Sequence, residues 1–264
     1  MEALLEVRGL CKRFPSRHGR EPSPWVIRDL TFSVREGEFL TIIGPSGAGK
    51  STLLNMIAQI DVASAGEIIF QGNKVVTADP KAIKPGLDRR VGYVTQDDLL
   101  LPWRTTLDNV LFALEVQGRL DDKTRAHAAM LMEAVGLKGY EKYYPHELSG
   151  GMRKRAALIR TLVYDPPVIL MDEPFASVDA QTRMQLQEDL LRLWSLGRKT
   201  IVFVTHDIAE AIVLGDRTLV LSKQPTRIAG EHPIPFPRPR DVKNFYALPG
   251  FAELWVTCGY HHVP

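Results

Sequence analysis

The chain has 264 residues, 45% of them hydrophobic, and its 33 basic and 31 acidic residues leave a formal charge of +2. This composition suits a globular protein with a buried core, and the near balance of charge gives no bulk electrostatic reason to expect nucleic acid as a partner. Cys11 and Cys258 are the only cysteines, which favours a reducing compartment without disulfides. We find neither a secretory signal nor a run of about 18 apolar residues, so work at a membrane would require another chain.

The first part of the chain combines short β-like pieces with one strand–loop–helix unit. The pieces at residues 4–7 and 26–34 flank a polar loop and predict a small antiparallel sheet. Residues 39–43 form an apolar run of β-formers that ends at a glycine-rich turn. Residues 51–58 follow, with apolar side chains on one helical face.

The middle and the end of the chain predict an α/β fold. Residues 105–163 are mostly helix formers and indicate a helical insertion. Continuous apolar runs at 168–171 and 200–204 are typical of strands buried on both faces of a parallel sheet. We expect a helix over 179–196 between them, then a helix over 208–214 capped by Asp207 and a strand over 218–221.

From residue 224 onward the chain is proline-rich, and we expect a tail without a helix or a central strand. We therefore divide the chain into an α/β domain at 1–223, with a helical subdomain at about 97–165, and a C-terminal extension at 224–264. Two arginine pairs, Arg17/Arg20 and Arg238/Arg240, leave two interpretations open, anion binding or solvated loop charges. His232, His261 and His262 would lack a fixed geometry for a metal in such a tail.

Residues 44–51 match the phosphate-binding pattern G-x4-G-K-[ST] at every position. Glycines let successive amides turn toward phosphate oxygens, and the following helix adds free N–H groups and the positive end of its dipole. Placed between a buried strand and a helix, the pattern predicts binding of ATP or GTP. Lys50 would reach the phosphates, and the Ser51 hydroxyl would bind Mg2+. The nucleotide-binding candidates are Gly44, Pro45, Ser46, Gly47, Ala48, Gly49, Lys50, Ser51 and Thr52.

Two adjacent acids, Asp172 and Glu173, directly follow the apolar run at 168–171. Side chains at the carboxyl end of a parallel strand can approach a site there. Asp172 is the carboxylate expected in the magnesium shell, and Glu173 is the candidate general base for the attacking water. An ordinary acidic strand end is the alternative interpretation.

A second helix start also exposes backbone amides. Ser149 occupies the N-cap position before a helix predicted over 153–163, and two glycines follow it, which predicts a second anion site. Alone, such a start is usually no more than a cap. The whole segment consists of Leu148, Ser149, Gly150, Gly151 and Met152.

These motifs, taken in order, resemble the ATP-binding subunits of ABC transporters over residues 4–222. The resemblance implies a P-loop NTPase fold, with a RecA-like parallel sheet core, an N-terminal antiparallel β-subdomain and a helical insertion. It implies that Gln96 is a catalytic and metal-site residue facing a membrane partner. It also places Asp179 in the D-loop and makes His206 a catalytic switch contacting the γ-phosphate. Phe14 is positioned like the aromatic that stacks on adenine, with a core phenylalanine as the alternative.

The resemblance further implies a head-to-tail dimer with two composite ATP sites, because the signature at 148–152 closes over the nucleotide of a second ATPase subunit. The implied cofactors are ATP and Mg2+. The implied partners are that second subunit, an integral membrane permease and, indirectly, an extracytoplasmic solute-binding protein. The expected location is the cytoplasmic face of the membrane, and no nucleic acid is expected.

Met152, where most members have glutamine, and the segments at 96–103 and 237–241 resemble the nitrate/sulfonate/taurine importer branch, whose solutes are small anions. The alternative is a soluble ABC ATPase acting on DNA or ribosomes. Members of that class carry long coiled-coil insertions or two cassettes, whereas Lys50 and Ser149 are only 99 positions apart here. A small-molecule P-loop kinase would not need the Ser-Gly-Gly helix start together with Asp179 and His206.

Overall fold

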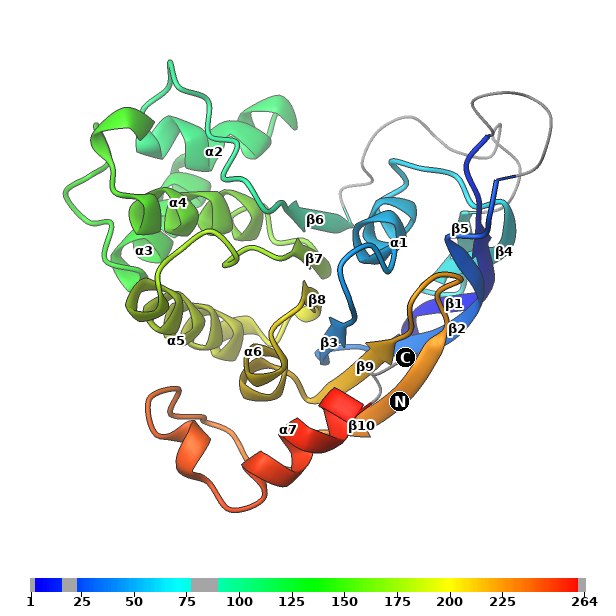
Figure 1. The fold of residues 1–264 in the computed structure, drawn as a ribbon. Helices are drawn as coiled ribbons and strands as arrows, with labels where there is room; N and C mark the ends of the chain where they lie inside the picture. The colour runs from blue at the N-terminus through cyan, green and yellow to red at the C-terminus, as the bar shows by residue number, and fades with distance from the viewer. Residues whose placement is uncertain (1–2, 16–22, 77–89, 261–264) are drawn as a thin grey trace.

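The computed structural model describes residues 3–15, 23–76 and 90–260, and Figure 1 shows two sheets with a separate group of helices. The first sheet lies on the N-terminal side and is antiparallel. This confirms the expected N-terminal antiparallel sheet and adds two strands that follow the first helix. In spatial order its strands are β2 (Ile27–Arg35), β1 (Ala3–Lys12), β4 (Ala65–Phe70) and β5 (Asn73–Val76).

The second sheet is parallel except at one edge, where β10 runs antiparallel to β9. Every residue of β3 and β8 is buried, as the continuous apolar runs predicted. In spatial order the strands are β10 (Ile228–Pro233), β9 (Arg217–Leu221), β3 (Phe39–Ile43), β8 (Thr200–Thr205), β7 (Val168–Asp172) and β6 (Val91–Val94).

The helices α2, α3 and α4 stand together, green in Figure 1, and confirm the helical insertion. Helix starts follow local capping chemistry, since Ser149, Asp179 and Asp207 each accept a hydrogen bond from the first turn of the helix they precede. The helices are α1 (Lys50–Ile57), α2 (Thr106–Val116), α3 (Asp122–Ala134), α4 (Gly150–Leu162), α5 (Ala180–Gly197), α6 (Ile208–Leu214) and α7 (Phe251–Tyr260), with short 3₁₀ turns at η2 (Pro145–Glu147) and η3 (Phe245–Ala247).

Alternate residues of the central strands enter two different hydrophobic cores. Phe39 and Phe203 pack with the helical group, α5 and α6, whereas Leu40 and Val202 pack with α1 and the antiparallel sheet. This is the period-two geometry of a strand covered on both faces. The carboxyl ends of β3, β7 and β8 therefore meet at one edge, between α1 and the helical group.

The C-terminal segment departs most from the sequence expectation. β10 extends the main sheet, α7 packs against α6, and Val242 and Phe245 are buried in the helical core. The expectation of a tail without a helix is therefore wrong, whereas the strand of this tail lies at a sheet edge and not at its centre. Pro233 ends an edge strand, where an N–H is not required for the ladder. The division at residue 224 remains a prediction.

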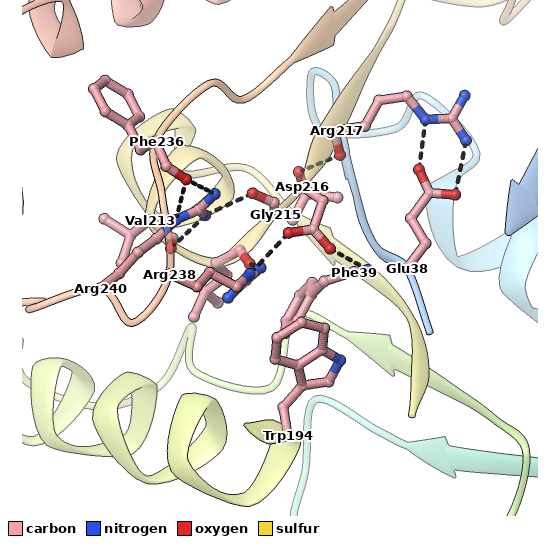
Figure 2. A network of polar contacts seen from close by, with 12 residues as sticks. Glu38, Phe39, Trp194, Val213, Gly215, Asp216, Arg217, Phe236, Arg238 and Arg240 are labelled. Carbon is pink, nitrogen blue, oxygen red and sulfur yellow. Dashed lines mark hydrogen bonds and ion pairs between the residues drawn. The ribbon is translucent and has the colours of Figure 1, made fainter. Parts of the chain in front are cut away.

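Three charged or titratable candidates of this segment have fixed surroundings. His232 lies within β10, so the expectation that it lacks a fixed geometry is wrong; His261 and His262 lie outside the described residues. Arg238 pairs with Asp216, and Arg240 donates to backbone carbonyls at the end of α6 (Figure 2), so neither is a solvated loop charge. Arg17 and Arg20 lie outside the described residues. None of the described helices is both long and apolar enough to cross a membrane.

Candidate functional site

The phosphate-binding pattern forms the loop between β3 and α1. Gly49 immediately precedes α1 with a φ of 74°, in the left-handed region that favours glycine, and a Cβ there would lie 2.9 Å from Val26 Cγ1. Lys50 is buried, and its Nζ donates to the carbonyls of Gly44 at 2.9 Å and Pro45 at 3.2 Å. The first two loop residues thus hold the lysine against the loop.

A cavity of about 540 Å3 collects most of the nucleotide and metal candidates. Phe14 is 45% exposed and lines this cavity, so the core alternative for this residue is wrong. Gln224 was not identified from the sequence; its side chain donates to the carbonyl of Gly47 at 2.6 Å. The lining residues are Phe14, Val26, Ser46, Gly47, Ala48, Gly49, Lys50, Ser51, Thr52, Gln96, Asp172, Glu173 and Gln224.

Glu173 stands at the centre of the polar side of this cavity. Its Oε2 lies 2.7 Å from His206 Nδ1, and its Oε1 lies 3.5 Å from Lys50 Nζ. Its backbone φ of 44° is in the left-handed region, a strained conformation for glutamate, and its N–H donates to the carbonyl of Val204. The fold thus holds one carboxylate between a lysine and a histidine from separate loops, an arrangement that can accept a proton from water.

Asp172, the last residue of β7, has the features of a metal ligand. Its Oδ1 is buried and has no hydrogen-bond partner among the described residues. Burial raises the pKa of Asp172, an effect that Glu173 reinforces and that Ser51 and Lys50 oppose. A buried carboxylate oxygen without a donor, beside a cavity that Ser51 and Gln96 also line, fits a Mg2+ ion, which prefers oxygen ligands.

Tyr93 and Asn55 extend this group, and no sequence motif pointed to them. The Tyr93 hydroxyl donates to Asn55 Oδ1 at 3.1 Å and lies 3.5 Å from Asp172 Oδ2. Burial and the Asp172 charge raise the pKa of Tyr93, so this phenol stays protonated as a donor. Tyr93 lies in β6, whose four-residue apolar run is too short to stand out by periodicity.

The signature segment lies apart from the cavity in its own chain. Ser149 caps α4 by accepting from Met152 N at 3.3 Å, and both Ser149 and Gly150 are exposed. A Cβ on Gly151 would lie 2.8 Å from Thr182 Cγ2, so glycine permits the close approach of α4 to α5. None of the five residues from Leu148 to Met152 lines the cavity, and Figure 1 shows α4 and α1 on opposite sides of the main sheet's edge.

Asp179 and the loop after β8 are linked through α5. Asp179 caps α5 by accepting from Thr182 N at 3.0 Å, and this hydrogen bond holds the pKa of Asp179 below its usual value. Arg183, one turn further, donates to the carbonyl of Val178 and lies 3.5 Å from Asp207 Oδ2. Sequence patterns could not reveal this link, because its members belong to different elements.

Comparison with known proteins shows the family of this chain. Residues 27–176 match the family model described as ABC transporter. The chain belongs to the ABC transporter family. It is 41% identical to an aliphatic sulfonates import ATP-binding protein of Bacillus cereus over 92% of each chain. It is also 39% identical to a taurine import ATP-binding protein of Rhizobium johnstonii, over 95% of this chain and 93% of that one.

Solved structures agree with this assignment. A dimeric ATP-binding cassette in a post-hydrolysis state, bound to ADP and Pi, superposes with a TM-score of 0.74 at 30% identity, covering 88% of this chain and 99% of that one. The predicted P-loop NTPase fold class, the resemblance to the importer branch and the ATPase activity are therefore confirmed. The ABC protein described here is an ATP-binding ATPase.

Proposed function

We propose that this ABC protein is the ATP-hydrolysing subunit of an importer that takes up a small anionic solute, of the sulfonate, taurine or nitrate type, through a separate membrane permease. The observation that carries this proposal is the similarity to import ATP-binding proteins over more than nine-tenths of both chains. Such coverage includes the helical group and the C-terminal segment as well as the ATP motifs. The type of solute is proposed from this similarity alone.

The residues that line the ATP cavity would each bind a different part of the nucleotide or its metal ion. Phe14 offers an exposed aromatic face for adenine, and the loop amides surround the phosphates. Lys50 exchanges its loop carbonyls for phosphate oxygens. Ser51, Asp172 and Gln96 would hold Mg2+, which neutralises charge on phosphate oxygens when bound.

Hydrolysis then depends on the pair of Glu173 and His206. Glu173 accepts a proton from the attacking water, and His206 Nδ1 holds the carboxylate in position. An ionised carboxylate only accepts, so Nδ1 carries the hydrogen that faces Glu173, and Nε2 would donate to the γ-phosphate in the imidazolium form of His206. A charge-stabilising donor from the second subunit completes the site.

The position of the signature segment supports a dimer. Ser149 and Gly150 are exposed and lie outside the cavity of their own chain. A head-to-tail pair of subunits would bring each signature onto the partner's nucleotide, giving two composite sites. ATP at both sites then favours the closed pair, and loss of phosphate releases it.

The surface beside Gln96 supports a permease contact. Leu99 is 59% exposed and Trp103 is 71% exposed, which is unusual for large apolar side chains in one short loop. Leu99 lines a second cavity together with Gln96 and Asp172, two residues that also line the ATP cavity. A permease segment seated there would contact side chains that reach the ATP site. In this proposal the protein works at the cytoplasmic face of the membrane, and the solute-binding protein works on the opposite side.

Co-purification from gently solubilised native membranes tests the proposal. We would tag the chain, use Glu173→Gln to hold the closed state, and identify what is recovered. A stoichiometric multi-spanning membrane protein is expected, together with its loss in Trp103→Ser and its retention in Trp255→Ser, a control at another exposed tryptophan. Recovery of only ribosomal or DNA-associated proteins would instead favour a soluble ABC ATPase and refute the importer.

A further inference from the structure

A third cavity, of about 540 Å3, lies between α5 and residues 238–242, and it shares no lining residue with the ATP cavity. Its size is that of small-molecule sites. Its walls are mainly apolar, with Leu191, Trp194 and Val242 contributing, while arginines supply most of the charge. We propose that this cavity binds a small organic anion, with the acidic head at the arginines and a short apolar body against Trp194.

The charges that line the cavity favour an anion. Four arginines, Arg192, Arg198, Arg238 and Arg240, face two carboxylates, Glu188 and Asp241. Both carboxylates already have partners, because Asp241 accepts from Lys243 N and Asn244 Nδ2, and Glu188 lies 3.4 Å from Lys243 Nζ. The lining therefore keeps a net positive charge.

Arg240 is a partly buried charge of this lining that has no carboxylate partner in the described part of the chain. Among the described residues its guanidinium donates to the backbone carbonyls of Phe236, Ile212, Val213 and Gly215, lies over the Phe245 ring, and pairs with no carboxylate. Burial and the neighbouring Arg238 lower the pKa of Arg240 to about 10, with Asp216 acting in the opposite direction. A partly buried cation without a counter-ion is unfavourable. An anion bound in the cavity would supply that counter-ion.

Arg238 and Trp194 form a preorganised wall. The Arg238 guanidinium lies 4.1 Å from the Trp194 ring centroid and pairs with Asp216 at 2.8 Å, the second contact being drawn in Figure 2, so it is held over the indole. An apolar body can pack on this wall without ordering new side chains, which reduces the entropic cost of binding.

Arg192 and Arg198 add two further guanidinium groups to the lining of the cavity. Both are exposed and have no acidic partner among the described residues, although Arg192 donates to the Ala134 carbonyl. Guanidinium groups bind carboxylate and sulfonate oxygens well because their N–H groups form a planar fork. The structure thus pairs an apolar wall with convergent donors, and an anion with an apolar body matches both.

Isothermal titration of the full chain with 1-hexanesulfonate at constant ionic strength tests the site. We expect a Kd of about 1 mM or tighter, with sulfate, which lacks the body, and 1-hexanol, which lacks the charge, each binding about tenfold more weakly or worse. The variant Arg192→Gln/Arg198→Asn should bind about fivefold more weakly or worse. Asparagine is chosen because Arg198 has a φ of 40°, which asparagine tolerates.

A matched control removes two other exposed arginines, in Arg28→Gln/Arg227→Gln, and should leave hexanesulfonate binding unchanged. Binding of an ATP analogue by the same samples shows that each variant is folded. The proposal is overturned if the chain binds hexanesulfonate no more tightly than sulfate or hexanol. It is also overturned if the two double variants bind hexanesulfonate with equal affinity. Neither result bears on the importer function, because the ATP cavity and the permease contact lie elsewhere.

Discussion

Replacing Glu173 by glutamine removes the proposed base while keeping the shape of the side chain. The Glu173 oxygens lie 2.7 Å from His206 Nδ1 and 3.5 Å from Lys50 Nζ. The amide of glutamine can still face both groups, but it cannot take a proton from water. General-base catalysis contributes about 10²–10⁴ in rate, or about 3–5 kcal/mol of transition-state free energy. We expect kcat to fall by that factor. KM for ATP should change by less than about threefold, because the loop contacts remain.

The assay is steady-state phosphate release by the purified chain across a range of ATP concentrations. Glu253→Gln is the matched control, because Glu253 is exposed on α7, far from the ATP motifs in sequence and outside the cavity lining. A Glu173→Gln variant that retains more than about one-tenth of the normal kcat would show that another group activates the water. A large rise in KM would instead show that the change disturbs Lys50.

Three further predictions concern the loop, the metal and pH. Gly49→Ala forces a Cβ to 2.9 Å from Val26 at a φ of 74°, so affinity for a fluorescent ATP analogue should fall about tenfold or more; unchanged affinity would contradict the tight approach. Asp172→Asn weakens the oxygen set for Mg2+, so the Mg2+ concentration for half-maximal activity should rise about tenfold, and an unchanged magnesium titration would exclude Asp172 as a ligand. Burial raises the pKa of Glu210 above its ordinary value of 4.5, so the folded state binds more protons and the free energy of unfolding falls as pH rises from about 4.5 through the folded pKa. Denaturant unfolding of Glu210→Gln should lose this component of the pH dependence, and identical pH profiles would contradict it.

The sequence predicted the elements whose signals are local. β3, β7 and β8 follow from continuous apolar runs, and α6 begins after its predicted cap, Asp207, and ends at Leu214 as expected. Hydrophobic period and capping chemistry act within a few residues, so they can be read without knowing what packs where. The fold class and the family followed from the order of such local motifs.

The C-terminal segment shows where composition misleads. Its prolines argued against a helix and a central strand, yet α7 forms and packs on α6, and β10 forms at a sheet edge. An edge strand tolerates proline, and whether a segment lies at an edge is decided by the rest of the sheet. The same holds for Arg240, which the sequence left between two interpretations and which the fold places on the carbonyls that end α6.

The sequence by itself determined which residues are able to do the chemistry: a phosphate loop with its lysine, two acids after a buried strand, and a capped Ser-Gly-Gly helix start. Only the tertiary structure decided which of them meet. Glu173 contacts Lys50 and His206 because three parallel strands end at one edge, and the signature lies away from that edge because α4 belongs to the helical group. The reason is physical: capping and periodicity depend on neighbours along the chain, whereas contact between loops depends on strand order and on the packing that fixes it.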